Sequence, residues 1–155
     1  MKDEAMNGRK IGKFLLGLVC VLCACSSDKV YTAFQPIDEN GWTKNDTAVF
    51  DFTIADTTCT YDIYLYVRHT DAYSYQNMWL FINDNDTMEF YLADRRGRWL
   101  GNHAGRLYEM PVIFFEDYSF EKAGNYSFRI VHGMRDTALE GVHDIGLTIQ
   151  KHGEE

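Results

Sequence analysis

The strongest constraint on the fold of this sequence is an alternation of apolar and polar residues with a period of two. In residues 49–54, for example, Phe50, Phe52 and Ile54 are separated by polar side chains. Successive side chains of a β-strand point to opposite faces of the sheet, so each such segment predicts a strand with one buried face. The same alternation occurs in residues 63–68, 88–92, 126–130 and 145–149.

Three further segments predict strands of a different kind. Met78–Ile82 is apolar at every position, which predicts a central strand covered on both faces, with Trp79 in the core. Residues 112–115 are similar, and the proline at position 111 places the start of that strand near a sheet edge. Residues 30–34 add one more candidate strand.

Turn residues separate these strands, and a long amphipathic helical pattern is absent. Asn83–Asp86 predicts a hairpin between two strands. Only residues 134–139 suggest a helical turn. Seven or eight short strands in about 120 residues predict a single all-β domain, folded as an antiparallel β-sandwich.

The N-terminus has the pattern of a secretory signal. Basic residues precede an apolar run from Phe14 to Ala24, whose 11 residues are too few to span a bilayer as a helix, which needs about 20. The run ends in Leu-Cys-Ala-Cys, which resembles the lipobox of bacterial lipoproteins. We therefore predict a lipoprotein signal peptide over residues 1–24, a lipidated Cys25 with a polar tether over residues 25–29, and a β-sandwich domain over residues 30–155.

Lipidation at Cys25 would place the domain on a membrane. The thiol would carry a diacylglyceryl group, and the freed amine would carry a further acyl chain such as palmitate. One chain anchors a protein weakly, whereas two or more hold it stably. Ser26 resembles an outer-membrane sorting signal, so we expect a lipid-anchored outer-membrane protein on either the periplasmic or the surface leaflet. The alternative is an uncleaved or conventionally cleaved signal.

Charge and motif content exclude several classes of function. The net charge is −8, and without residues 1–24 the chain has 11 basic and 21 acidic residues, a net charge of −10. Such a domain repels phosphate backbones, so we expect no nucleic-acid partner. None of the five histidines has a metal-ligand spacing, and no nucleophile elbow or phosphate-binding loop is present. We expect a protein that is not an enzyme, with no catalytic residue, metal or cofactor.

One arginine-rich segment is a candidate partner surface. Trp99 lies between Gly97 and Gly101, and glycines permit close backbone approach in an ordered loop. We predict that Trp99 is the aromatic anchor of a surface that binds a partner, and that charged residues form the rim of this surface. The rim would consist of Arg95, Arg96, Arg98 and Arg106. The alternative is that Trp99 caps the core and the arginines are solvated. Trp42 also lies beside a glycine, which suggests either exposure or a role in pinning a loop.

Four Asp-Thr pairs form a possible modification pattern. Each is followed by a small or apolar residue, which resembles the acceptor motif of a periplasmic O-glycosylation system in some Gram-negative bacteria. The alternative is ordinary turn chemistry, in which Asp-Thr pairs are common. The candidate acceptors are Thr47, Thr57, Thr87 and Thr137.

Several motifs stand out in combination. They are Asn40-Gly41-Trp42 with Lys44 and Asp46, Arg68-His69-Thr70 with Tyr73 and Tyr75, Leu92-Ala93-Asp94, Gly97-Arg98-Trp99-Leu100-Gly101, Met134-Arg135, Leu139-Glu140-Gly141-Val142 and Asp144–Ile149. Together, from the lipobox to about Lys151, they resemble the gliding-motility lipoprotein family GldH. Where the family often shows Tyr-Pro-Tyr, this chain has Tyr73-Ser74-Tyr75 and lacks the proline.

The resemblance implies a cell-envelope lipoprotein needed for surface gliding, in machinery coupled to type IX secretion. We expect a non-enzymatic accessory or scaffold subunit, whose partners are the bilayer and other envelope proteins of gliding or secretion. The alternative is a glycan-binding lipoprotein, for which an exposed, coplanar aromatic row would be needed; burial would favour the scaffold. The residues that discriminate between the two are Trp42, Tyr73, Tyr75 and Trp99.

Overall fold

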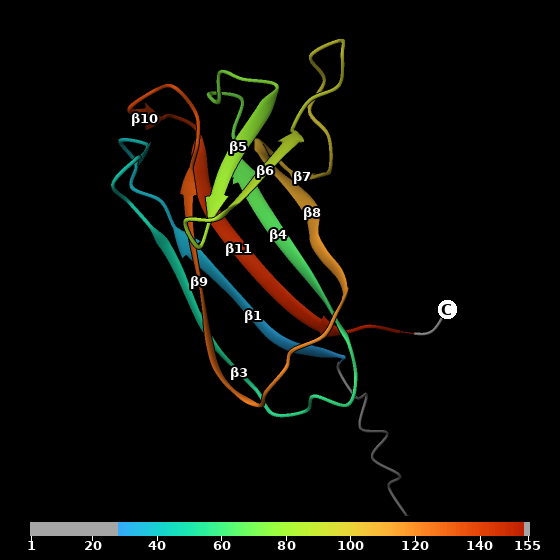
Figure 1. Cartoon of the computed structure of the whole chain (residues 1–155). Coiled ribbons are helices and arrows are strands. Elements are labelled where there is room, and N and C mark those ends of the chain that lie inside the picture. Colours follow the sequence, from blue (N-terminus) through green and yellow to red (C-terminus); the bar gives the residue numbers. More distant parts are fainter. Residues whose placement is uncertain (1–27, 154–155) are drawn as a thin grey trace, which may run out of the picture.

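Eight strands of six or more residues, with three shorter ones, build the part of the chain that the computed structural model describes, residues 28–153 (Figure 1). All sheet pairings are antiparallel, which confirms the predicted all-β class. The strands are β1 (Lys29–Pro36), β2 (Trp42–Thr43), β3 (Ala48–Ile54), β4 (Tyr61–His69), β5 (Asn77–Ile82), β6 (Asp86–Tyr91), β7 (Asn102–Ala104), β8 (Leu107–Tyr118), β9 (Gly124–His132), β10 (Ala138–Leu139) and β11 (Val142–Lys151).

Two sheets pack face to face in a sandwich (Figure 1). The larger has the order β1-β11-β4-β8-β7, and the smaller has the order β3-β9-β5-β6. The short pair β2-β10 lies at one end. The first and last long strands, β1 and β11, are neighbours, so the larger sheet depends on pairing between the two ends of the domain.

The predicted alternation determines which side chains enter the core. Phe50, Phe52 and Ile54 of β3 are buried, while the residues between them are exposed or half-buried. In β11, however, both faces are buried. The ring of Phe34 covers Gly146 so closely that a Cβ at this glycine would lie 2.6 Å from the Phe34 Cδ1 atom and closer still to its Cε1. A side chain at position 146 would therefore displace Phe34.

The structure corrects three local predictions. β5 is not covered on both faces, because Trp79 and Phe81 are exposed on the outer side of the smaller sheet, so the placement of Trp79 in the core is wrong. β8 also has an exposed side chain, Ile113, in the segment expected to be doubly covered. Residues 134–139 form bends and strand β10 rather than a helical turn.

Two other local predictions are confirmed. β5 and β6 form the expected hairpin, in which Asn83 and Asp84 have positive φ angles of 51° and 62°. β7 pairs with β8 only as far as Glu109, so Pro111 lies where β8 has become an edge strand in the described part of the sheet. Proline is tolerated there because an edge strand need not donate on both sides.

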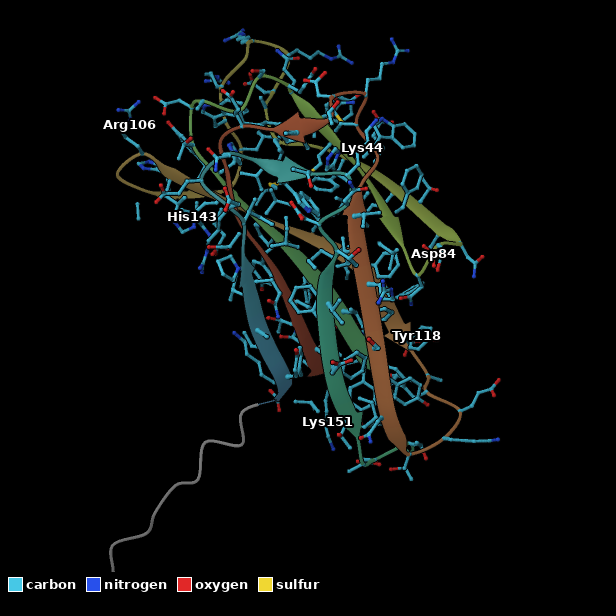
Figure 2. The ribbon with its side chains drawn as sticks, turned by 90° about the vertical axis from the view of Figure 1, so that its left-hand side faces the viewer. Lys44, Asp84, Arg106, Tyr118, His143 and Lys151 are labelled. Carbon is cyan, nitrogen blue, oxygen red and sulfur yellow. The ribbon has the colours of Figure 1, made fainter. Side chains whose placement is uncertain are left out.

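The two ends of the sandwich differ in what they contain. β1 begins at the end where β11 finishes. There the backbone N–H of Lys151 donates to the Asp28 carbonyl at 2.7 Å, and the Lys151 ammonium forms a salt bridge with the Asp56 carboxylate at 2.7 Å. We call this the anchor end. At the opposite end lie the segments 37–47, 70–76, 92–106 and 133–141, which we call the loop end. Lys44 and Arg106 mark the loop end in Figure 2, and Lys151 marks the anchor end.

The predicted signal peptide and Cys25 lie outside the described residues. Within residues 28–153, the chain has no helix long and apolar enough to cross a membrane.

Candidate functional site

All eight residues predicted to bind a partner lie in the loop end. Backbone hydrogen bonds tie its segments together: the Thr70 N–H donates to the Gly141 carbonyl at 2.8 Å, and the Leu92 N–H donates to the Gln76 carbonyl at 2.7 Å. The Lys44 N–H donates across to segment 133–141 at 3.1 Å. Residues far apart in sequence therefore form one connected surface.

Trp42 pins a loop from inside the core. Its side chain is fully buried, and its indole N–H donates to the Asp46 carbonyl at 2.7 Å. The indole meets the imidazole of His132 edge-on, with ring centroids 5.4 Å apart. The Asp46 carboxylate in turn accepts a hydrogen bond from the Thr43 hydroxyl at 2.6 Å. Of the two alternatives for Trp42, exposure or loop pinning, the structure shows the second, and no face of the indole is left for a partner.

Tyr73 and Tyr75 lie next to each other but in different environments. Tyr73 is buried, and its hydroxyl donates to the Asn77 carbonyl at 2.8 Å, while burial raises the pKa of this phenol. Tyr75 is half-buried, and its hydroxyl donates to the Asp136 carboxylate at 2.6 Å. That hydrogen bond is the main cause of the raised pKa of Tyr75. The pair therefore joins the β4–β5 connection to segment 133–141.

Trp99 packs inward, against a buried histidine. The indole is half-buried and meets the His69 ring edge-on at a centroid distance of 4.6 Å, while Tyr108 stacks on the same imidazole at 5.5 Å. His69 Nδ1 lies 3.1 Å from the Thr70 carbonyl, so it carries the proton of the neutral ring. Nε2 is buried without a partner among the described residues, and burial lowers the pKa of His69. This packing is the arrangement expected if Trp99 caps the core.

The arginines divide into two pairs. Arg98 forms a salt bridge with Asp94 at 2.7 Å, and Arg106 forms one with Asp71 at 3.1 Å. The Asp94 carboxylate also accepts the backbone N–H groups of Arg96 and Arg98, and these hydrogen bonds lower the pKa of Asp94. Arg95 and Arg96 are exposed, and within residues 28–153 their guanidinium groups have no ion-pair partner. The carboxylate of Asp94 thus orders a turn that presents two unpaired positive charges.

The other predicted sites are dispersed. Thr57, Thr87 and Thr137 are exposed, and Thr47 is half-buried, so their modification stays a prediction. Across residues 28–153, no three His, Cys, Asp or Glu side chains gather in a group that could hold a metal ion.

Sequence reasoning missed the aromatic side chains that are most exposed. They lie on β5 and β6 rather than in the loop end, and they are Trp79, Phe81 and Tyr91. The signal that could have found them is the period of two inside Met78–Ile82: Met78, Leu80 and Ile82 share one face and are fully buried. Because the residues between them are also apolar, the alternation was hidden.

Comparison with known proteins supplies the family. The family model described as GldH lipoprotein matches residues 29–149. A gliding motility lipoprotein GldH homolog from Christiangramia forsetii is 27% identical over 148 residues, covering 86% of this chain and 90% of the relative. The gliding motility lipoprotein GldH of Flavobacterium johnsoniae is 25% identical over 161 aligned residues, covering 94% of this chain and 99% of the relative. No solved structure matches the chain. With the family model spanning nearly the whole described domain, the chain belongs to the GldH lipoprotein family.

Proposed function

We propose that this protein is a non-enzymatic accessory or scaffold subunit of cell-envelope machinery, held on the outer membrane by acyl chains on Cys25. Membership of the GldH lipoprotein family supports a role in gliding motility, and the machinery we propose is the one linked to type IX secretion. The observation that carries the proposal is the separation of the two ends of the sandwich. β1 begins at one end, and the loops lie at the other (Figure 1).

The geometry restricts how the domain can sit on a membrane. β1 begins at Lys29, four residues after Cys25. Four residues of extended chain reach at most about 14 Å, so lipidation at Cys25 would hold the anchor end beside the bilayer. β8 alone has 12 residues, which corresponds to about 40 Å of strand. The loop end would therefore face away from the membrane, where other envelope proteins can reach it.

The exposed arginines are the part of the loop end best suited to contact a partner. Arg95 and Arg96 carry two positive charges that have no ion-pair partner among the described residues, on a domain whose net charge is strongly negative. Rim charges of this kind affect the rate of association and the choice of partner. The aromatic side chains beneath them support the loop end from within, since Trp99 packs on His69 and Tyr108.

The glycan-binding alternative is not favoured at the loop end. It requires an exposed, coplanar aromatic row, but Trp42 and Tyr73 are buried, and Trp99 meets Tyr73 at an interplanar angle of 49°. Trp42, Tyr73 and Trp99 therefore act as internal supports, which is the arrangement expected of a scaffold.

The anchor is tested by Cys25→Ser in the full chain. We expect the variant to leave the membrane fraction and appear in the soluble periplasm, because the acyl chains that hold it are lost. Cys59→Ser is the matched control, since it removes a cysteine outside the lipobox and should leave the protein in the membrane pellet. Retention of the Cys25→Ser protein in the pellet at high salt would show that the anchor lies elsewhere.

The scaffold role is tested by charge reversal at the loop end. Arg95→Glu with Arg96→Glu should reduce co-purification of partner proteins from detergent-solubilised envelopes, and should impair gliding, while the melting temperature stays unchanged. Lys122→Glu with Arg129→Glu makes the same change in charge outside the loop end and is the control. If the loop-end variant keeps all its partners and full motility, this surface is not where the subunit acts.

A further inference from the structure

The outer face of the smaller sheet displays three exposed aromatic side chains. Trp79 is 39% exposed, Phe81 is 43% exposed and Tyr91 is 60% exposed. The register places them on one face, because Asn77 pairs with Tyr91 and Trp79 pairs with Glu89 on the adjacent strand. We propose that this face, with the pocket beside Trp79, is a binding site for a neutral oligosaccharide. We call it the Trp79 face.

A shallow pocket adjoins the indole. It has a volume of about 390 Å³, within the range of small-molecule sites. Gly133 contributes to its floor: a Cβ there would lie 3.0 Å from Phe81 Cε2 and 3.3 Å from Trp79 Cβ, so a side chain would push against both aromatic residues. The residues that line the pocket are Tyr75, Asn77, Trp79, Gly133, Met134 and Arg135.

The backbone holds Trp79 in place at this pocket. The Gly133 N–H donates to the Trp79 carbonyl at 2.7 Å, and the Trp79 N–H lies 3.4 Å from the Met134 sulfur, which accepts it. Segment 133–135 is thereby fixed against β5. An aromatic surface that is already ordered loses little conformational entropy when a ligand stacks on it.

Polar groups suited to sugar hydroxyls lie beside the ring. The Asn77 side-chain amide donates to Glu89 Oε1 at 2.7 Å. This bond fixes both side chains and leaves free the amide oxygen, one amide N–H and the second carboxylate oxygen. Arg135, which also lines the pocket, supplies guanidinium donors. Fixed donors and acceptors next to an aromatic ring match a sugar, which has hydroxyls on its rim and C–H groups on its face.

The charge of the Trp79 face favours a neutral ligand. Its centre is aromatic and uncharged. At its border lie the carboxylates of Glu89 and Asp136, which accept hydrogen bonds from Asn77 and Tyr75, and the guanidinium of Arg135. An anionic polymer would find no cluster of positive charge here. The pocket also favours a small ring over a flat protein surface, because it gives a single sugar residue both a stacking partner and hydrogen-bond partners.

The test is a direct binding measurement on the lipid-bearing protein. It should be purified in a polyoxyethylene detergent, because glucoside and maltoside detergents carry sugar headgroups that would compete. Neutral hexasaccharides of glucose, mannose, xylose and N-acetylglucosamine are titrated to several millimolar, with calorimetry and tryptophan fluorescence as readouts. We expect saturable binding of at least one of them.

The variants locate the site. Trp79→Ala should weaken binding by about tenfold or more through loss of stacking, and Glu89→Ala should weaken it without removing a ring. Tyr118→Ala is the matched control, since Tyr118 is also 37% exposed but lies on β8, and it should bind as the unmodified protein does. Thermal unfolding should show that all three variants remain folded.

Three outcomes would overturn the proposal. No binding of any hexasaccharide would show that the face is not a sugar site. Equal binding by the Trp79→Ala variant, or equal loss in the Tyr118→Ala variant, would place the binding elsewhere. Loss of a protein partner on Trp79→Ala, with no sugar bound by the unmodified protein, would make this face a protein-docking surface instead.

Discussion

Gly141 offers a sharp test of how the loop end is held together. This glycine follows β10 and has a φ angle of +79°, a conformation that L side chains rarely adopt. A Cβ at this position would lie 2.7 Å from the Ala72 carbonyl carbon and closer still to the Tyr73 nitrogen. The β4–β5 connection therefore lies directly against the glycine, and Gly141→Ala would force the two segments apart.

Three effects contribute to the cost in folding free energy. The positive φ angle costs an alanine about 1–2 kcal/mol. The clash with backbone atoms adds about 1–3 kcal/mol, in the range of overpacked sites. If the segments separate, the hydrogen bond from Thr70 N–H to the Gly141 carbonyl is also weakened, at about 1 kcal/mol. We expect Gly141→Ala to lower the free energy of unfolding by about 3–6 kcal/mol in total, a large part of the usual 5–15 kcal/mol.

Gly105→Ala is the matched control. Gly105 also has a positive φ angle, +63°, but a Cβ there would meet no atom within 4 Å. This variant should therefore lose only the conformational part, about 1–2 kcal/mol. Urea unfolding followed by circular dichroism measures both variants, and the difference between them should be at least about 2 kcal/mol. Equal costs for the two variants would refute the close packing of Gly141 against the β4–β5 connection.

Two further predictions concern the half-buried Trp99 and the two buried histidines that end β4 and β9, His69 and His132. Trp99→Ala should lower the free energy of unfolding by about 2–3 kcal/mol, less than the loss of a fully buried tryptophan, and the melting temperature by about 10 °C. Arg96→Glu with Arg98→Glu should lower the melting temperature far less. Similar melting temperatures for the two variants would contradict this prediction. Stability should also fall as the pH drops below about 6.5, because the unfolded imidazoles of His69 and His132 then gain protons, while burial lowers the pKa of both in the folded state. His152 offsets part of this loss, because its hydrogen bond with Asp62 raises its pKa in the folded state. A urea midpoint that does not change between about pH 7.5 and about pH 5.5 would contradict the second prediction.

The strands and their inward faces could be predicted from the sequence, because burial of one face of a strand makes apolar and polar residues alternate along the chain. Phe50 and Ile54 in β3 and Leu147 in β11 lie in the core as that pattern predicts. The same reasoning was limited in Met78–Ile82, where every residue is apolar. With no polar side chain to mark the solvent face, the sequence is compatible with a strand covered on one side or on both. Only the tertiary structure decides, because no segment among residues 28–153 covers the outer side of Trp79 and Phe81 in β5.

The three tryptophans illustrate what depends on tertiary structure. The sequence determined their local setting: Trp42 and Trp99 lie beside glycines in connections, and Trp79 lies within a strand. It did not determine their burial. Trp42, for which exposure and loop pinning were both open, is buried, and Trp79, which was expected in the core, is exposed. Trp42 can be buried because the Asp46 carbonyl accepts its only polar hydrogen, so the indole loses no hydrogen bond on leaving water. Trp79 is exposed because Met78 and Leu80 occupy the core on either side of it, and the alternation of the strand turns the residue between them outward.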